Sequence, residues 1–135
     1  MRHPKWLDVR IVLAIHERQV AEHGGSPGVR DLGLLESAIY RPQNESLYQE
    51  PPPSIFGLAA SYGFGIVKNH AFVDGNKRAA FMAMYVFLRM NGFVISAPEP
   101  EVVLFMLRLA TGEESQDSLE TWLTAYSKAL PDVER

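Results

Sequence analysis

The sequence predicts an all-α fold, a compact bundle of about six helices around a buried central helix. Two observations favour this fold class. Apolar residues recur at the three- and four-residue spacing of amphipathic helices over most of the chain, and short stretches rich in glycine or proline separate these segments. The length of 135 residues suits one domain, residues 1–135, that is large enough to bury a core.

The composition excludes several classes of protein. The chain has no cysteine, so disulfides and thiolate zinc sites are excluded. A net charge of -3 argues against direct binding of nucleic acid. The apolar runs at residues 11–15 and 56–67 are too short to cross a bilayer, and the first run does not have the form of a signal peptide. We therefore expect a cytoplasmic protein that does not contact a membrane.

Two helices are predicted before the middle of the chain. The first runs from Leu7 to Glu22 and ends at a pair of glycines, which adopt the left-handed backbone that a helix end needs. The second runs from Leu32 to Tyr40, with Asp31 as its N-cap, and ends at Pro42. The following residues, Gln43 to Pro53, end in three prolines and predict an exposed loop or a short hairpin.

The third predicted helix, Ser54 to Asn69, carries several alanines and glycines that would let another backbone approach closely. Phe93 to Ser96 predicts a brief extended piece, and Pro100 to Ala110 a helix with acidic residues at its positive end. The last predicted helix runs to about residue 130. Asp117 and Glu120 stand at the spacing of a capping box at its start.

The strongest predicted helix, Asn76 to Met90, is apolar nearly all round beyond its first turn, so we expect it to be the central one. Its first N–H groups lack partners within the helix, and its dipole makes this end an anion site. Lys77 and Arg78 are unfavourable there against the dipole, unless a phosphate lies among them. Gly75 permits a tight turn, and Asn76 can cap the helix or donate to an oxygen.

Three residues before this helix complete the predicted site. The Asp74 carboxylate would repel a phosphate unless a magnesium ion lies between them. His70 can serve as a general base for an incoming hydroxyl, and Phe72 is expected to anchor the loop in the core. Each residue taken alone has a structural alternative, as does His16, which we expect to be a structural histidine of the first helix. The structural alternative does not explain why so many chemical groups gather at the start of one helix.

The stretch HAFVDGNKR, residues 70–78, resembles the motif H-x-F-x-D-x-N-K-R of the Doc (death-on-curing) branch of the Fic superfamily, with all six specified positions matched. The resemblance continues in HGGSPGVRDLGLLESAIYRP, residues 23–42, and in ATGE, residues 110–113. It implies a helical bundle of the Fic/Doc type.

The resemblance also implies an activity. Fic proteins transfer a nucleotidyl group from ATP to a protein hydroxyl, and their motif has glycine where Lys77 stands and a later arginine where Phe81 stands. Proteins of the Doc branch share both departures. They are toxins, each paired with an antitoxin, and they phosphorylate elongation factor Tu with the nucleotide reversed, which arrests translation. The resemblance thus implies ATP and Mg²⁺ as cofactors, an antitoxin as partner and elongation factor Tu as target.

Position by position, the resemblance makes His70 the base and Asp74 the residue that holds Mg²⁺. The phosphates would be bound by five residues, namely Lys68, Gly75, Asn76, Lys77 and Arg78. Two alternatives stay open: a Fic-like adenylyl transferase, and a binding module that keeps the fold without turnover.

The irregular residues 43–53 are expected to hold a target peptide in extended form by strand addition. SLYQE, residues 46–50, superficially resembles the inhibitory S/T-x-x-x-E motif of some Fic proteins, but Pro51 follows it. Inhibition is therefore expected to need a separate antitoxin.

Overall fold

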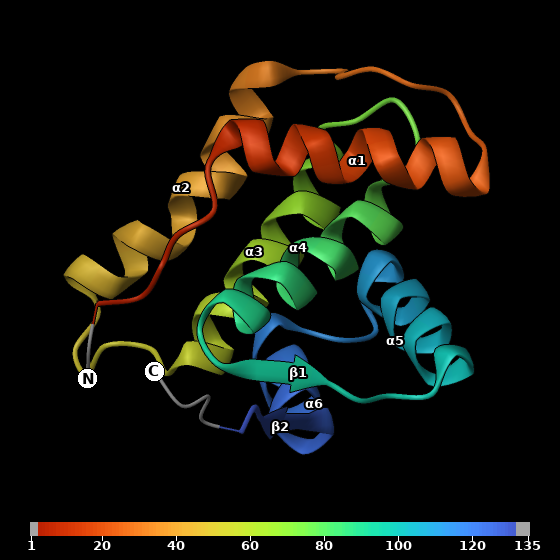
Figure 1. The fold of residues 1–135 in the computed structure, drawn as a ribbon. Helices are drawn as coiled ribbons and strands as arrows, with labels where there is room; N and C mark the ends of the chain where they lie inside the picture. The colour runs from red at the N-terminus through yellow and green to blue at the C-terminus, as the bar shows by residue number, and fades with distance from the viewer. Residues whose placement is uncertain (1–2, 132–135) are drawn as a thin grey trace.

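A computed structural model of the chain describes residues 3–131 and has the predicted all-α architecture (Figure 1). The helices are six, as expected, and two short strands accompany them. None of the helices in this described part has the length and apolar character needed to cross a membrane. In chain order the elements are α1 (Val9–His23), α2 (Leu32–Tyr48), α3 (Ile55–Asn69), α4 (Asn76–Met90), β1 (Phe93–Ile95), α5 (Glu99–Thr111), α6 (Gln116–Tyr126) and β2 (Ser127–Ala129).

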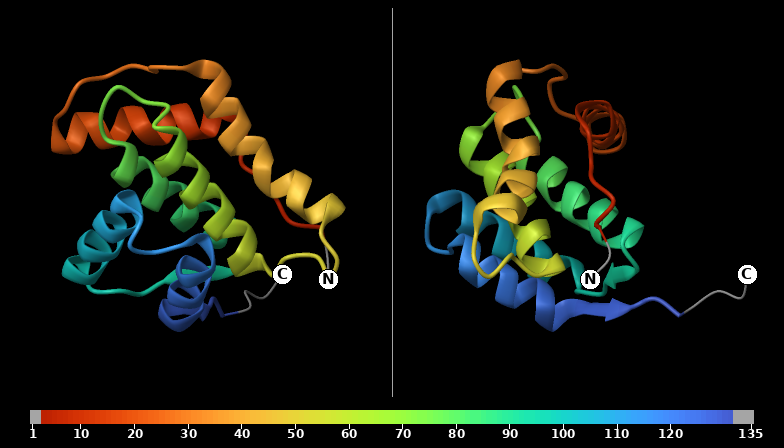
Figure 2. Two further views of the ribbon diagram at one scale, coloured as in Figure 1. Left: turned by 180° about the vertical axis from the view of Figure 1, so that it is seen from behind. Right: turned by 90° about the vertical axis from the view of Figure 1, so that its left-hand side faces the viewer.

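Helices α3 and α4 lie side by side at the centre, and the other helices pack around them (Figures 1 and 2). We expected α4 to be the most buried helix, but ten of the fifteen residues of α3 are buried against seven of fifteen in α4. The small residues of α3 explain the difference. A Cβ atom at Gly65 would lie 3.2 Å from the Cβ atom of Ala38 on α2, so the two helices approach as closely as glycine allows.

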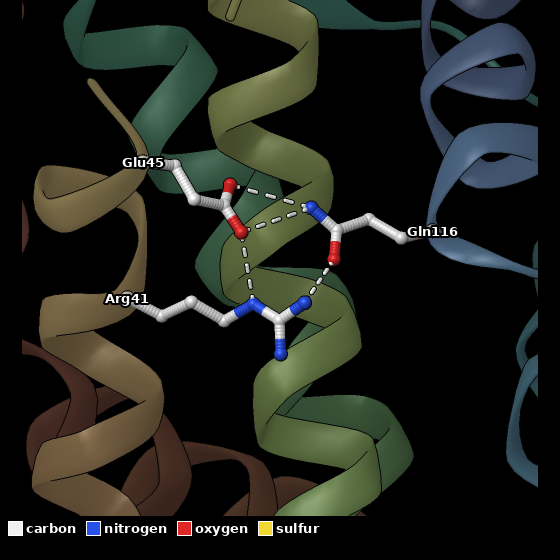
Figure 3. Close-up of polar contacts among 3 residues, drawn as sticks. All are labelled: Arg41, Glu45 and Gln116. Atoms are coloured by element: carbon white, nitrogen blue, oxygen red, sulfur yellow. Dashed lines mark hydrogen bonds and ion pairs between the residues drawn. The ribbon is translucent and has the colours of Figure 1, made fainter. Parts of the chain in front are cut away.

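Helix α2 is two turns longer than the sequence predicts. Pro42 does not end it, although an internal proline removes one backbone hydrogen bond and typically costs about 3 kcal/mol. The buried Pro42 ring and polar contacts beyond it stabilise the continuation. Arg41 pairs with Glu45 at 3.0 Å, and both side chains bond to Gln116 of α6 (Figure 3). The predicted loop or hairpin over residues 43–53 is therefore wrong for residues 43–48, which are helical, whereas residues 49–53 form an irregular connection as the sequence predicts.

The C-terminal helix is shorter than predicted. It ends at Tyr126, and the next three residues form β2, which pairs antiparallel with β1. The Ser96 N–H donates to the Tyr126 carbonyl at 2.7 Å, and the Leu130 N–H donates to Gly92 at 2.8 Å. Pairing with a distant strand thus supplies the backbone bonds that continued helix would have made.

The capping box of α6 also differs from the prediction. It is formed by Ser115 and Ser118, whose hydroxyls each accept a hydrogen bond from the other's backbone N–H, at 3.0 and 2.7 Å. Glu120 lies beyond the cap and accepts a bond from the Ser54 hydroxyl at 2.9 Å. Since Ser54 is the N-cap of α3, this bond ties the last helix to the start of the central one.

Candidate active site at the start of α4

The motif forms the tight connection between α3 and α4. His70 caps the end of α3 with a left-handed backbone, φ 48° and ψ 51°, and its side chain is exposed. This conformation costs a residue with a side chain roughly 1–2 kcal/mol, so surrounding contacts must hold it. Gly75 is the N-cap of α4 and has a φ of 75°, which fits the tight turn expected of it.

The Asn76 side chain bonds to the backbone of its own loop. Its buried side chain accepts a bond from the Phe72 N–H and donates one to the Phe72 carbonyl, both at 3.0 Å. The alternative that this side chain caps the helix is therefore wrong, because Gly75 is the N-cap and the amide bonds to the loop instead. The amide has a second N–H, and its role toward a phosphate stays a prediction. The first bond inside α4 runs from the Ala79 N–H to the Gly75 carbonyl at 2.9 Å. The backbone N–H groups of residues 76–78 precede it and are the donors left for an anion.

Phe72 anchors the loop in the core, as the sequence predicts. Its ring is fully buried and stacks on the His16 ring of α1, with 3.8 Å between centroids and 5° between planes. His16 is itself buried, as expected of a structural histidine, and its Nε2 lies 2.7 Å from the carbonyl oxygen of Asp74. The stacked rings of Phe72 and His16 support the motif loop from the core.

Asp74 presents its carboxylate at the surface. Oδ2 accepts a hydrogen bond from the Ser26 N–H at 3.2 Å, and Oδ1 accepts one from the Gly75 N–H at 2.8 Å. These two bonds, together with the charges of Arg78 and Lys77, hold the pKa of Asp74 below its usual range. The group is therefore ionised at neutral pH and has lone pairs left for a further ligand.

The lowered pKa predicts how an Asp74→Asn variant responds to acid. Because the folded pKa lies below the unfolded value of about 3.9, ionised Asp74 contributes its full stability above that value. The contribution is lost as the pH falls through the lowered folded pKa. We expect Asp74→Asn to be less stable than wild type near neutral pH, with the difference shrinking in acid. Urea unfolding over a pH series measures this, with Glu17→Gln, an exposed carboxylate in the middle of α1, as the control. A difference that is the same at every pH would contradict it.

The cations divide into two groups. Lys77 and Arg78 are exposed on the first turn of α4 and line one end of a groove of about 440 Å³ between α1, α4 and α5. Lys68 is not among the residues that line this groove. Its Nζ lies 5.7 Å from the centre of the Phe64 ring and beside Gly112, in the connection between α5 and α6. The structure thus places Lys77 and Arg78 on the same groove and Lys68 outside it.

A further segment lies beside the motif. The sequence did not predict it as part of the site. Residues 25–31, between α1 and α2, form this bracing segment, which lies beside the α3–α4 connection in both views (Figures 1 and 2). Val29 forms a bridge with Phe72, and the Val73 N–H donates to the Gly28 carbonyl at 3.1 Å. At Gly25 a Cβ atom would lie only 2.8 Å from Asp74 Oδ2, so only glycine lets the segment pass this close.

Within the bracing segment, Arg30 donates three hydrogen bonds to carbonyl groups at the α3–α4 connection. Its backbone N–H donates to the Ala71 carbonyl at 2.7 Å. Its side chain donates from Nε to the His70 carbonyl at 2.7 Å and from Nη2 to the Asn69 carbonyl at 3.0 Å. Resemblance over residues 23–42 pointed to this stretch, but nothing in the sequence paired it with carbonyls about forty residues away.

The connection between α2 and α3 lies far from the motif. It joins α3 at Ile55, whereas His70 follows the other end, and fifteen helical residues span about 22 Å. Figure 1 shows the two connections at opposite ends of the molecule. The expectation that residues 43–53 hold a target peptide by strand addition is wrong for residues 43–48, which are helical, and the remaining residues lie far from His70.

Comparison with known proteins supports the family resemblance seen in the motif. A family model described as the Fic/DOC family matches residues 6–88. The chain is 34% identical over 130 residues to the protein kinase doc of Escherichia phage P1, an overlap of 96% of this chain and 99% of that protein. It is 35% identical over 108 residues to the toxin Doc of Mycolicibacterium smegmatis, covering 78% and 83% of the two chains. With the motif, the helical bundle and these similarities together, the chain belongs to the Fic/Doc family.

Proposed function

We propose that this chain is the toxin of a toxin–antitoxin pair and a protein kinase. It would transfer the γ-phosphate of ATP to a serine or threonine hydroxyl of a translation factor, by family resemblance elongation factor Tu. Such a target would place the toxin in the cytoplasm. The observation that carries the proposal is the short α3–α4 connection. It places His70 at the end of α3, the Asp74 carboxylate on the Gly75 N–H, and Lys77 and Arg78 on the first turn of α4. The names of the relatives, a protein kinase and a toxin, support it.

The chemistry assigns one role to each group. His70 accepts the proton of the target hydroxyl, whose oxygen forms a bond to the γ-phosphorus. The bond between that phosphorus and its bridging oxygen breaks, and the electron pair leaves with ADP. Arg78 and the N–H groups at the start of α4 stabilise the charge that spreads over the phosphoryl oxygens. The exposed imidazole of His70 is accessible to a protein substrate.

Asp74 suits the Mg²⁺ that the family resemblance implies. Its carboxylate is exposed and ionised, and a single carboxylate is a common protein contribution to a magnesium site shared with phosphates. Bound Mg²⁺ would supply positive charge that offsets the repulsion between Asp74 and the phosphates. The bonds from Ser26 and Gly75 hold the carboxylate in place for this role.

Lys77 distinguishes a kinase from an adenylyl transferase. It stands on the first turn of α4, where Fic proteins have glycine, and its side chain would narrow the space over the helix end. An ATP placed as in Fic proteins would collide with it. A reversed ATP would instead bring its terminal phosphate to His70, and Lys77 would add a point charge beside the other phosphates.

Two labelled forms of ATP test the reaction type. The protein is incubated with purified elongation factor Tu and with a mixture of translation factors, in Mg²⁺ and ATP labelled on either the γ- or the α-phosphate. We expect the γ-label to reach the target, the α-label to stay in solution, and a chelator to stop transfer. Transfer of the α-label would show adenylylation instead, and the absence of both labels from every factor would favour a binding module without turnover.

The groove beside Lys77 and Arg78 supports the expected antitoxin partner. Phe81, Met82 and Tyr85 of α4 line it, and the exposed Val103 and Leu107 continue the apolar surface along α5. Exposed apolar surface of this kind marks interaction sites, and a groove between helices suits an amphipathic helix. An antitoxin helix bound there would also cover the cations that bind phosphate, which would explain inhibition.

A further inference from the structure

We propose that Arg30 is a positioning residue for His70, whose guanidinium holds the backbone that carries the imidazole. The inference rests on the proposed function, in which His70 is the base. Arg30 does not need to touch ATP or the target hydroxyl for this role. It acts on the carbonyl oxygens of Asn69 and His70, at the end of α3.

The geometry of the contact is specific. Nε of Arg30 donates to the carbonyl of His70 itself at 2.7 Å, and Nη2 donates to the preceding carbonyl, of Asn69, at 3.0 Å. Both bonds are charge-assisted, which makes each stronger than a bond between neutral groups. Two donors in a rigid fork hold the two peptide units that flank His70, one through the Asn69 carbonyl and one through the His70 carbonyl.

His70 needs this support because of its backbone. Within residues 3–131 it is the one residue other than glycine with a positive φ, at 48°. A residue with a side chain leaves this region unless its surroundings hold it there. The His70 N–H bonds to Ile66 at 3.2 Å inside the last turn of α3, so one side of the residue is fixed by the helix. Arg30 fixes the other side, at the carbonyl.

The side chain of Arg30 can be removed without releasing the bracing segment. The backbone N–H groups of Arg30 and Asp31 both donate to the Ala71 carbonyl, at 2.7 and 3.1 Å, and an alanine at position 30 keeps both bonds. Asp31 also remains the N-cap of α2, with its bond from the Leu34 N–H at 2.9 Å. Arg30→Ala therefore removes two bonds to the catalytic loop and leaves the neighbouring structure in place.

Steady-state transfer of the γ-phosphate measures the effect. We expect Arg30→Ala to lower kcat by about 10- to 100-fold, because small displacements of a catalytic group are costly, while KM for ATP stays within about twofold. Arg30→Lys, which keeps the charge but not the fork, should recover part of the loss. Arg18→Ala, which removes another exposed guanidinium that pairs only with Glu22 on α1, is the matched control and should match wild type.

A second readout does not depend on turnover. NMR of the free protein should show shifted backbone and imidazole resonances of His70 in Arg30→Ala, with the resonances of α5 and α6 unchanged. An unchanged kcat together with unchanged His70 resonances would overturn the inference. A higher KM for ATP at unchanged kcat would also overturn it, since Arg30 would then bind the nucleotide. If the wild-type protein transfers no phosphate, the proposed function fails, and the His70 resonances still decide whether Arg30 orders the loop.

Discussion

The His70→Ala variant is expected to lose phosphate transfer by about 10²- to 10⁴-fold, the usual contribution of a general base. Alanine retains the backbone at this position and removes only an exposed imidazole, so the fold should persist. The loss should appear in kcat, because the base acts on the proton of the target hydroxyl as the new bond forms.

Transfer to the target protein under single-turnover conditions measures this effect, and circular dichroism with thermal unfolding verifies that the variant is folded. His3→Ala, which removes another exposed histidine, serves as the control and should behave as wild type. Equal rates for His70→Ala and wild type would refute the assignment of the base.

Phe72→Ala is expected to have the largest effect on stability. Truncation of a fully buried phenylalanine typically costs about 3–5 kcal/mol, a large share of the roughly 5–15 kcal/mol that stabilises a domain. The cavity would open beneath the motif and remove the stacking partner of His16. Since His16 holds the Asp74 carbonyl, transfer should fall even at temperatures where the variant is still folded.

Urea unfolding gives the difference in free energy, and transfer assays well below the midpoint give the difference in activity. Phe81→Ala is the matched control, because this ring is only half-buried and lines the groove. We expect it to cost clearly less stability. Equal losses of stability in the two variants would show that Phe72 does not anchor the loop in the way that the structure indicates.

Features set by neighbouring residues could be predicted from the sequence. The bounds of α4, Asn76 and Met90, agree with the prediction at both ends, because the glycine before the helix and the apolar spacing within it are local signals. Asp31 also caps its helix, as the sequence predicts. The prediction that α2 ends at Pro42 is wrong, because the cost of a proline inside a helix is outweighed by distant contacts. The Pro42 ring is buried, and the neighbouring Arg41 bonds to Gln116, about seventy residues away.

The site likewise has features set by neighbouring residues, which could be predicted, and features set by distant residues, which could not. His70, Asp74, Lys77 and Arg78 lie within nine residues, so one motif identified all of them. The bonds of the Asn76 side chain to Phe72 were not predicted, because local spacing does not show which backbone groups of the loop a side chain reaches. The contacts of Arg30 join residues forty positions apart, and no periodicity or composition records such a pairing.

Helix α6 determines at which point of synthesis on the ribosome the core of the domain can be completed. Leu119 and Leu123 are fully buried in the core, and Glu120 is bonded to Ser54, the N-cap of α3. The motif leaves the exit tunnel about forty residues earlier, at Arg78, but the core around α3 cannot close until α6 has emerged as well. A chain with this order of elements completes the core that supports the motif only near the end of its own synthesis.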